Sequence, residues 1–140
     1  MQHTSIYLNL PIDDVDRSRA FFTALGYPIE EAMSDEKCLA VVLGPSHVAM
    51  LLRRDFFETF LNGRAARTDG HEALICVDLD SAEAVDAHVD AALAAGGTEV
   101  YSERHGDWMY NRSFADPDGH IWEAMWMDMA AAQAAGQFGG

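Results

Sequence analysis

The stretch Phe114-Ala-Asp-Pro-Asp-Gly-His-Ile-Trp-Glu123 joins a tight turn to a strand, and it is the part of the sequence that decides the fold. Asp116-Pro-Asp-Gly119 is typical of a turn, because proline presets its own φ, aspartate bonds its own backbone and glycine tolerates positive φ. The alternating pattern after the turn predicts a strand in which Glu123 shares a face with Ile121 and Met125. A carboxylate among apolar neighbours must be paired or must line a wet cavity, since burying it alone is costly.

The chain contains an internal repeat that includes this strand. The stretch His47–Asp55 aligns with His120–Asp128, and each copy starts with histidine, ends with aspartate and follows a Gly/Pro turn. Upstream, Tyr7–Asp13 and Glu72–Asp78 are both strand patterns that run into an acidic helix start. After each of these two strand patterns, apolar residues recur at helical spacing until a glycine ends the predicted helix. The sequence therefore predicts strand, helix and three further strands, twice, with the further strands at 27–32, 37–43 and 47–53 and at 98–102, 108–115 and 120–127.

The boundaries of the two halves follow from the turn signals. We place a first module at residues 4–62 and a second at 70–128, within one domain of residues 1–128. The apolar segment 55–61 predicts a short helix at the join, ended by Asn62-Gly63. Residues 129–140 are expected to form a flexible tail, with a helical extension through Ala135 as the alternative. We expect one face of each first strand, and the inner face of each helix, to be buried: Ile6, Leu8, Leu10, Ala73, Ile75, Val77, Phe21, Leu25, Val85, Val89 and Leu93.

Composition excludes several classes of function. The formal net charge is −14 and Lys37 is the only lysine, which argues against binding to nucleic acid or to an anionic membrane. The sequence has 49% hydrophobic residues, yet no apolar run approaches the roughly 18 residues that a membrane span needs. Cys38 and Cys76 are too few for a disulfide framework, so we expect two reduced cysteines and a cytoplasmic protein.

A duplicated βαβββ module, in which an Asp-Pro-Asp-Gly turn leads into a last strand with glutamate, resembles the vicinal oxygen chelate superfamily. This group includes glyoxalase I, the bleomycin and fosfomycin resistance proteins and the extradiol dioxygenases. The resemblance covers residues 4–128, and Asp14–Gly26 is similar to the first helix of the family. It implies an α+β fold whose two modules form a curved mixed sheet around a central cavity. It also implies a symmetric homodimer.

The resemblance implies a divalent metal ion, of the Zn, Fe, Mn or Ni type, held by one residue from the first and one from the last strand of each module. Glu123 falls on the position of the last strand, and the repeat places Met50 at its counterpart in the first module. Tyr7 and Glu72 fall on the two first-strand positions. Methionine and tyrosine do not suit such a metal, so no metal site is assigned. The candidate ligands are Glu72, Glu123 and His71, the last one residue out of phase with the inward face.

The inward-facing residues otherwise suit a small organic molecule. We expect Tyr7, Asn9, Met50, Trp108, Tyr110, Arg112 and Met125 to bind it, and Arg112 to pair with the ligand or with Glu123. The preferred function is therefore binding of a small aromatic or oxygenated molecule between the modules. The alternative is a metal-dependent lyase, isomerase or ring-cleaving dioxygenase in which Glu123 and Glu72 are catalytic. A second alternative is a non-catalytic module that binds a protein partner.

Overall fold

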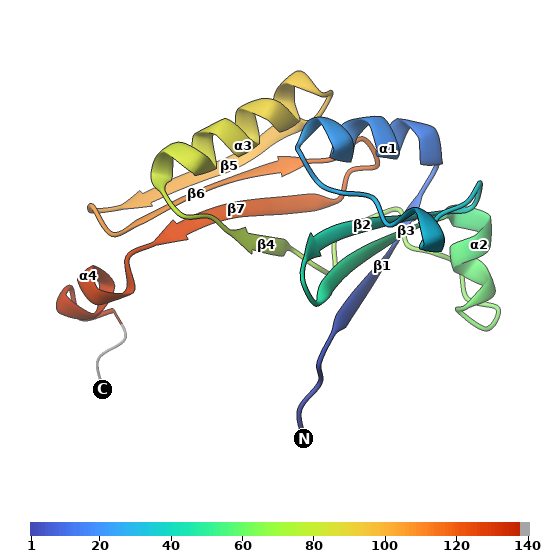
Figure 1. Cartoon of the computed structure of the whole chain (residues 1–140), viewed down its shortest axis with the longest axis horizontal. Coiled ribbons are helices and arrows are strands. Elements are labelled where there is room, and N and C mark those ends of the chain that lie inside the picture. The colour runs from blue at the N-terminus through green and yellow to red at the C-terminus, as the bar shows by residue number, and fades with distance from the viewer. Residues whose placement is uncertain (138–140) are drawn as a thin grey trace. The chain divides into compact units, whose positions relative to one another are not determined.

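The computed structural model describes residues 1–137 of the chain, so the last three residues of the expected tail lie outside the described part. The chain forms two compact units. Unit 1 comprises residues 1–70, and unit 2 begins at His71. Each unit is a mixed α+β structure in which a sheet carries one long helix on one face (Figure 1). The α+β class predicted from the sequence is confirmed.

Unit 1 contains a three-stranded sheet in the order β1-β3-β2. Strand β1 is parallel to β3, and β2 is antiparallel to β3. The elements along the chain are β1 (Ile6–Ile12), α1 (Val15–Ala24), the 3₁₀ helix η1 (Glu31–Met33), β2 (Cys38–Gly44), β3 (His47–Arg53) and α2 (Arg54–Thr59).

Helix α1 begins after an aspartate that caps it and ends just before a glycine. The Asp14 carboxylate accepts a hydrogen bond from the backbone N–H of Arg17 at 2.9 Å, which caps the first turn. Gly26 follows the helix with φ of 92°, a conformation that favours glycine. The rings of Phe21 and Phe22 pack edge to face, 5.1 Å between centroids, and both side chains are fully buried. They form the core of unit 1 with Leu39, Val41, Ala49 and Leu51 of the sheet.

The strand expected at residues 27–32 is the main difference from the predicted topology. Only one isolated bridge, between Ile29 and Val41, forms in this segment. Pro28 has no N–H to donate to a ladder, and its carbonyl instead accepts from Val42 at 2.9 Å. The Glu30 carboxylate then accepts from the backbone N–H of Ala32 at 3.1 Å and starts η1. The prediction of a strand here is wrong because local capping competes with the sheet.

Unit 2 contains a four-stranded sheet in the order β4-β7-β6-β5, in which only β4 and β7 are parallel. The Ser81 hydroxyl caps the long helix by accepting from the N–H of Ala84 at 3.0 Å. Gly96 ends this helix with φ of 106°. The elements are β4 (Ile75–Asp78), α3 (Ala82–Ala94), β5 (Thr98–His105), β6 (Met109–Ala115), β7 (Ile121–Met127) and α4 (Met129–Ala134). Helix α4 occupies part of the segment expected to be a tail.

The turn quoted at the start is built around one buried carboxylate. Oδ1 of Asp116 accepts from the backbone N–H groups of Asp118 and His120, at 2.9 and 3.0 Å. Its Oδ2 accepts from the indole N–H of Trp122 at 3.0 Å. Burial raises the pKa of Asp116, although these donors act in the opposite direction. Asp116 therefore fixes the turn and the first residues of β7 together.

Burial follows the predicted faces, with exceptions at the strand starts. Phe21, Val85 and Val89 are fully buried, as predicted. Ile6 is 55% exposed, because it is the first residue of an edge strand. Ala73 is exposed because β4 begins only at Ile75. The expected burial of Ile6 and Ala73 is wrong. The other predicted core positions, Leu8, Leu10, Leu25, Ile75, Val77 and Leu93, are half-buried.

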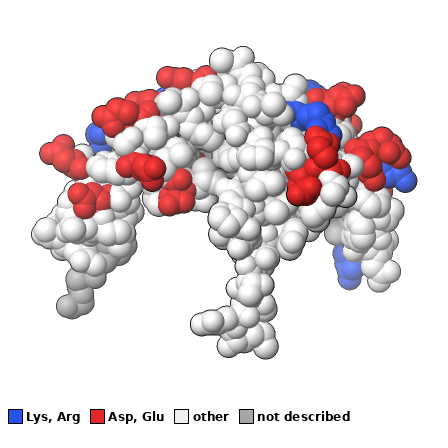
Figure 2. Space-filling model, in the orientation of Figure 1, with Lys and Arg blue, Asp and Glu red and all other residues white. Residues whose placement is uncertain are grey.

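Charge is distributed unevenly between the units. From His71 onward the sequence has only two arginine or lysine residues, Arg104 and Arg112, although most of the acidic excess lies there. Figure 2 shows acidic side chains gathered on the helix α3 side of unit 2. Within the described residues, no helix is long and apolar enough to cross a membrane.

Candidate functional site

Unit 1 has a pocket on the face of its sheet that lies opposite helix α1. Asn9 of β1 is paired with Met50 of β3, so both side chains point to this face. Cys38 of β2 is paired with Leu52 of β3 and lies on the same face, one row further along. These four side chains form the floor of the pocket. Tyr7 has the same parity, but it is 51% exposed and does not line the pocket.

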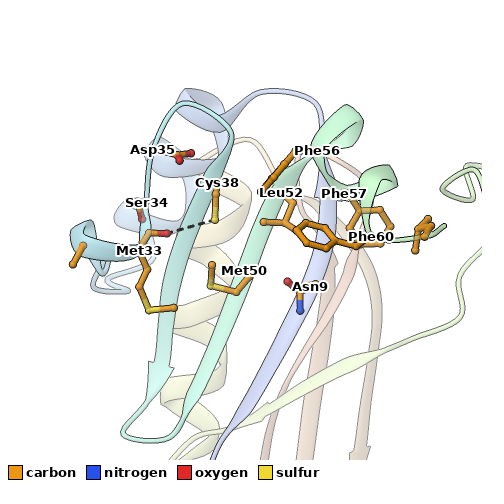
Figure 3. Close-up of a pocket in the computed structure, with 12 residues that line it drawn as sticks. Asn9, Met33, Ser34, Asp35, Cys38, Met50, Leu52, Phe56, Phe57 and Phe60 are labelled. Carbon is orange, nitrogen blue, oxygen red and sulfur yellow. Dashed lines mark hydrogen bonds between the residues drawn. The ribbon is translucent and has the colours of Figure 1, made fainter. Parts of the chain in front are cut away.

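Helix α2 forms one wall of the pocket. It follows β3 without a loop and brings Phe56, Phe57 and Phe60 beside the sheet (Figure 3). The rings of Phe56 and Phe60 pack edge to face with centroids 5.1 Å apart. Phe60 is 67% exposed although it is a large apolar side chain. An exposed aromatic wall beside a hollow is the arrangement that an apolar ligand would cover.

The η1 segment and the loop after it form the opposite wall. Met33, Ser34 and Asp35 line the pocket there, and Met50 lies between this wall and the phenylalanines in Figure 3. The Ser34 hydroxyl donates to the carbonyl of Glu30 at 2.8 Å and accepts from the N–H of Ala40 at 3.0 Å. The wall is therefore fixed to the sheet by hydrogen bonds and does not depend on a ligand for its position.

The pocket has a volume of about 870 Å³, within the range typical of small-molecule sites. Its lining is mainly aromatic and sulfur-containing, with few polar groups. Burial and the nearby Asp35 carboxylate raise the pKa of the Cys38 thiol, which also donates weakly to the carbonyl of Met33 at 3.5 Å. Cys38 is therefore a neutral part of the lining at neutral pH.

Two of the predicted ligand-binding residues, Asn9 and Met50, line this pocket. The α2 phenylalanines were not among the residues predicted to bind a ligand, although the sequence predicts the helix that carries them. The sequence contains a signal for them. The short helix expected at residues 55–61 has apolar residues on more than one face, so packing against the sheet alone leaves part of its apolar surface exposed. Met33 and Asp35 were not predicted either, because they lie between two segments that were expected to be strands.

Glu123 lies in unit 2, on the sheet face opposite helix α3. It is paired with Ser113 of β6 and with Cys76 of β4, so these three side chains share a row. Burial, followed by a hydrogen bond and charge repulsion from Glu123, raises the pKa of the Cys76 thiol to about 11. Met125 lies on the same face, paired with Asn111, whose buried Oδ1 has no hydrogen-bond partner among the described residues.

The expected pairing of Glu72 with Glu123 is wrong. The residue across from Glu123 is Cys76, and Glu72 precedes the start of β4. Glu72 lies three residues before the first residue of β4, outside the strand. His71 is one residue further away, and both are exposed. The repeat was aligned two residues out of register at the first strands, because the observed pairing makes Asn9 the counterpart of Cys76.

The expected role of Arg112 beside Glu123 is also wrong. Arg112 is paired with Ala124, so it lies on the helix side of the sheet and Glu123 lies on the other. Its guanidinium bonds Glu99 at 2.9 Å and two α3 carboxylates, Asp86 and Asp90, at 3.0 Å each. These contacts hold helix α3 on the sheet.

Tyr110 and Trp108 also have contacts within unit 2. The Tyr110 hydroxyl donates to Asp86 at 2.8 Å, on the same side of the sheet as Arg112. Trp108 stacks on His105 at the β5–β6 turn, with ring centroids 5.6 Å apart. Tyr110 therefore does not share the Glu123 face. For Tyr7, Trp108 and Met125, a role in ligand binding stays a prediction.

The donor groups present do not suit a divalent metal of the kind that the resemblance implies. In unit 2 the last-strand carboxylate is accompanied by a thiol whose pKa is raised, and in unit 1 the equivalent pair is Asn9 and Met50. Among residues 1–137 no group of three His, Cys, Asp or Glu side chains is arranged to hold a metal ion. Such sites usually need at least three N, O or thiolate ligands.

The contact between Cys76 and Glu123 gives a testable prediction. In Glu123→Gln, the hydrogen bond to a charged acceptor and the charge repulsion are lost, while burial remains. We expect the pKa of Cys76 to fall part of the way from about 11 toward its ordinary value, so alkylation by iodoacetamide at pH 9 should be several-fold faster. Peptide-resolved mass spectrometry measures this rate, with the buried Cys38 as internal control. Equal rates in the wild type and the variant would contradict it.

Comparison with known proteins agrees with this architecture. Two units that each carry a helix over a mixed sheet are also found in solved structures of glyoxalase and bleomycin resistance proteins, which share this fold. Residues 4–44 match the family model of the bleomycin resistance protein-like N-terminal region. The predicted resemblance is confirmed: the chain has the fold of the vicinal oxygen chelate superfamily.

Three solved structures illustrate the similarity. A glyoxalase/bleomycin resistance protein/dioxygenase family enzyme from Burkholderia phytofirmans is 21% identical, with a TM-score of 0.77 over 87% of this chain and 97% of the other. A hypothetical protein from S. aureus is 24% identical, with a TM-score of 0.76 over 90% and 95%. The fosfomycin resistance protein FosX from Listeria monocytogenes is 16% identical, with a TM-score of 0.65 over 93% and 98%. No curated protein matches the sequence significantly.

Proposed function

We propose that the protein binds a small organic molecule with an apolar, aromatic body in the pocket of unit 1. The observation that carries the proposal is the α2 wall, where Phe56, Phe57 and Phe60 face a hollow of about 870 Å³ instead of a packed core. Aromatic ligands stack on such rings in offset or edge-to-face geometry. Asn9 adds a carboxamide to the floor that can orient one polar group of the ligand.

Resistance proteins among the structural relatives give this proposal a parallel, since some are named for the drug that they resist. The proposal concerns binding, not chemistry. The alternative of a lyase, isomerase or dioxygenase has no support from the donor groups around Glu123. The second alternative, a partner-binding module, has no observation in its favour that the small-molecule pocket does not explain better. We retain a homodimer in the cytoplasm as an expectation.

A change at Phe60 tests the proposal. Phe60→Glu places a charge on the aromatic wall, and we expect it to weaken binding of the neutral fluorescent probe N-phenyl-1-naphthylamine about tenfold, or 1.4 kcal/mol. Because Phe60 is 67% exposed, the fold should tolerate the change. Fluorescence titration measures the affinity, and circular dichroism melts check the fold.

Leu74→Glu is the matched control. Leu74 is 57% exposed, equally apolar, and outside the pocket, so its substitution adds the same charge elsewhere. It should leave the probe affinity within about twofold of the wild-type value. If the wild-type protein does not bind the probe, or if Phe60→Glu and Leu74→Glu lower the probe affinity equally, the pocket of unit 1 is not the binding site.

A further inference from the structure

The lining of the unit 1 pocket is mainly apolar but carries one charge. Asp35 is the one charged residue among the residues that line it, and no arginine, lysine or histidine is present in that lining as the structure describes it. Asp35 lies at one end of the pocket, across from the α2 phenylalanines (Figure 3). An anionic ligand would thus meet a carboxylate and no cation among the lining residues.

The Asp35 carboxylate can accept further hydrogen bonds from a ligand. Its Oδ1 accepts from the backbone N–H of Lys37 at 2.8 Å, which fixes the side chain in the loop. No salt bridge to Asp35 is present in residues 1–137. A carboxylate has lone pairs for about four donors, so most of its accepting capacity is left for a bound group.

Arg53, which interacts electrostatically with Asp35, and Lys37 form no salt bridge with Asp35 in residues 1–137. The Arg53 guanidinium is bound to Asp55 through two hydrogen bonds of 2.6 and 2.8 Å. The Lys37 ammonium lies 5.8 Å from the centroid of the Phe56 ring. That distance is within the range of a cation–π contact with a ring of this wall.

We propose that the ligand is a cationic amphiphile, with an aromatic or aliphatic body against the α2 phenylalanines and an ammonium or guanidinium group at Asp35. This inference rests on the proposed function and specifies its ligand class. Direct attraction to the Asp35 carboxylate favours the cation. The net charge of −14 also raises the local concentration of cations.

Three probes with the same body test the charge preference. 4-Phenylbutylamine is cationic at pH 7, 4-phenylbutan-1-ol is neutral and 4-phenylbutanoate is anionic. Their affinities are measured by displacement of N-phenyl-1-naphthylamine, in 0.15 M salt to limit the effect of the overall charge. We expect the amine to bind about fivefold more tightly than the alcohol, and the carboxylate to bind most weakly.

A matched pair of variants assigns the preference to the pocket. Asp35→Asn keeps an acceptor for the Lys37 N–H and removes the charge, so the amine-to-alcohol affinity ratio should fall about fivefold. Glu36→Gln removes the same charge from the adjacent, exposed position outside the lining, and should leave the ratio within about twofold. The alcohol affinity should be unchanged in both variants.

The outcomes of these experiments distinguish the cation preference from the proposed function, which is binding of a small molecule in the unit 1 pocket. If the alcohol binds but the amine is no tighter, or if both variants lower the ratio equally, the cation preference is overturned and the pocket stands as an apolar site. If N-phenyl-1-naphthylamine does not bind the protein and none of the three phenylbutyl compounds competes with it, both the cation preference and the proposed function are overturned.

Discussion

Replacing Asp116 with alanine is expected to lower the free energy of unfolding by about 4 kcal/mol, the largest effect among the changes considered for this protein. Asp116 is 5% exposed, and its two oxygens accept from Trp122, Asp118 and His120. Alanine leaves three donors without their acceptor, and the indole N–H is buried with Trp122. An unsatisfied buried donor costs about 1–3 kcal/mol. Urea unfolding followed by tryptophan fluorescence measures the loss.

Asp116→Asn is the conservative control for this prediction. The amide oxygen can still accept from the backbone N–H groups of Asp118 and His120, whereas the amide nitrogen cannot accept from Trp122. The expected loss is therefore about 1–2 kcal/mol, between wild type and alanine. If alanine costs no more than asparagine, the two backbone bonds do not stabilise the turn, and the role given to Asp116 in fixing β7 is incorrect.

Arg112→Met is expected to lower the free energy of unfolding by about 2–3 kcal/mol. The substitution leaves Asp86, Asp90 and Glu99 close together without the cation that they share. Removing one partner of a buried pair costs about 3–5 kcal/mol, but these carboxylates are about half exposed, so the value is reduced. Urea unfolding again provides the measurement. Arg104→Met, which removes a cation lying 4.0 Å from the Tyr110 ring centroid, should cost less than about 1 kcal/mol.

The effect of Arg112→Met should depend on pH in a defined direction. The Tyr110 hydroxyl, and then the Arg112 guanidinium, hold the pKa of Asp86 below its usual value. A carboxyl group with a lowered pKa stabilises the fold above its unfolded pKa of about 3.9, and this contribution is lost as the pH falls through the folded pKa. The difference in the free energy of unfolding between wild type and Arg112→Met should therefore become smaller below about pH 4. A difference that grew on acidification would contradict the ion-pair interpretation.

The sequence was sufficient wherever the information is local. The Asp-Pro-Asp-Gly turn and the alternating faces of β1 and β7 depend on residues within a few positions of each other. The parity that placed Asn9 and Met50 on one face is of this kind, and both residues line the pocket. Local rules failed at residues 27–32, where a proline and a capping glutamate compete with strand formation.

What only the tertiary structure decided is the register between strands and the use of helix α2. A shift of one residue moves a side chain to the other face of a sheet, so the pairing of Ser113 with Glu123 places Arg112 on the side of α3. Strands β4 and β7 are parallel and far apart in sequence, so no turn sets their register, and the contact between Cys76 and Glu123 could not be read from either strand alone. Similarly, the phenylalanines of α2 are simply apolar in the sequence. They form a pocket wall because α2 follows β3 directly and therefore lies beside the sheet face opposite α1.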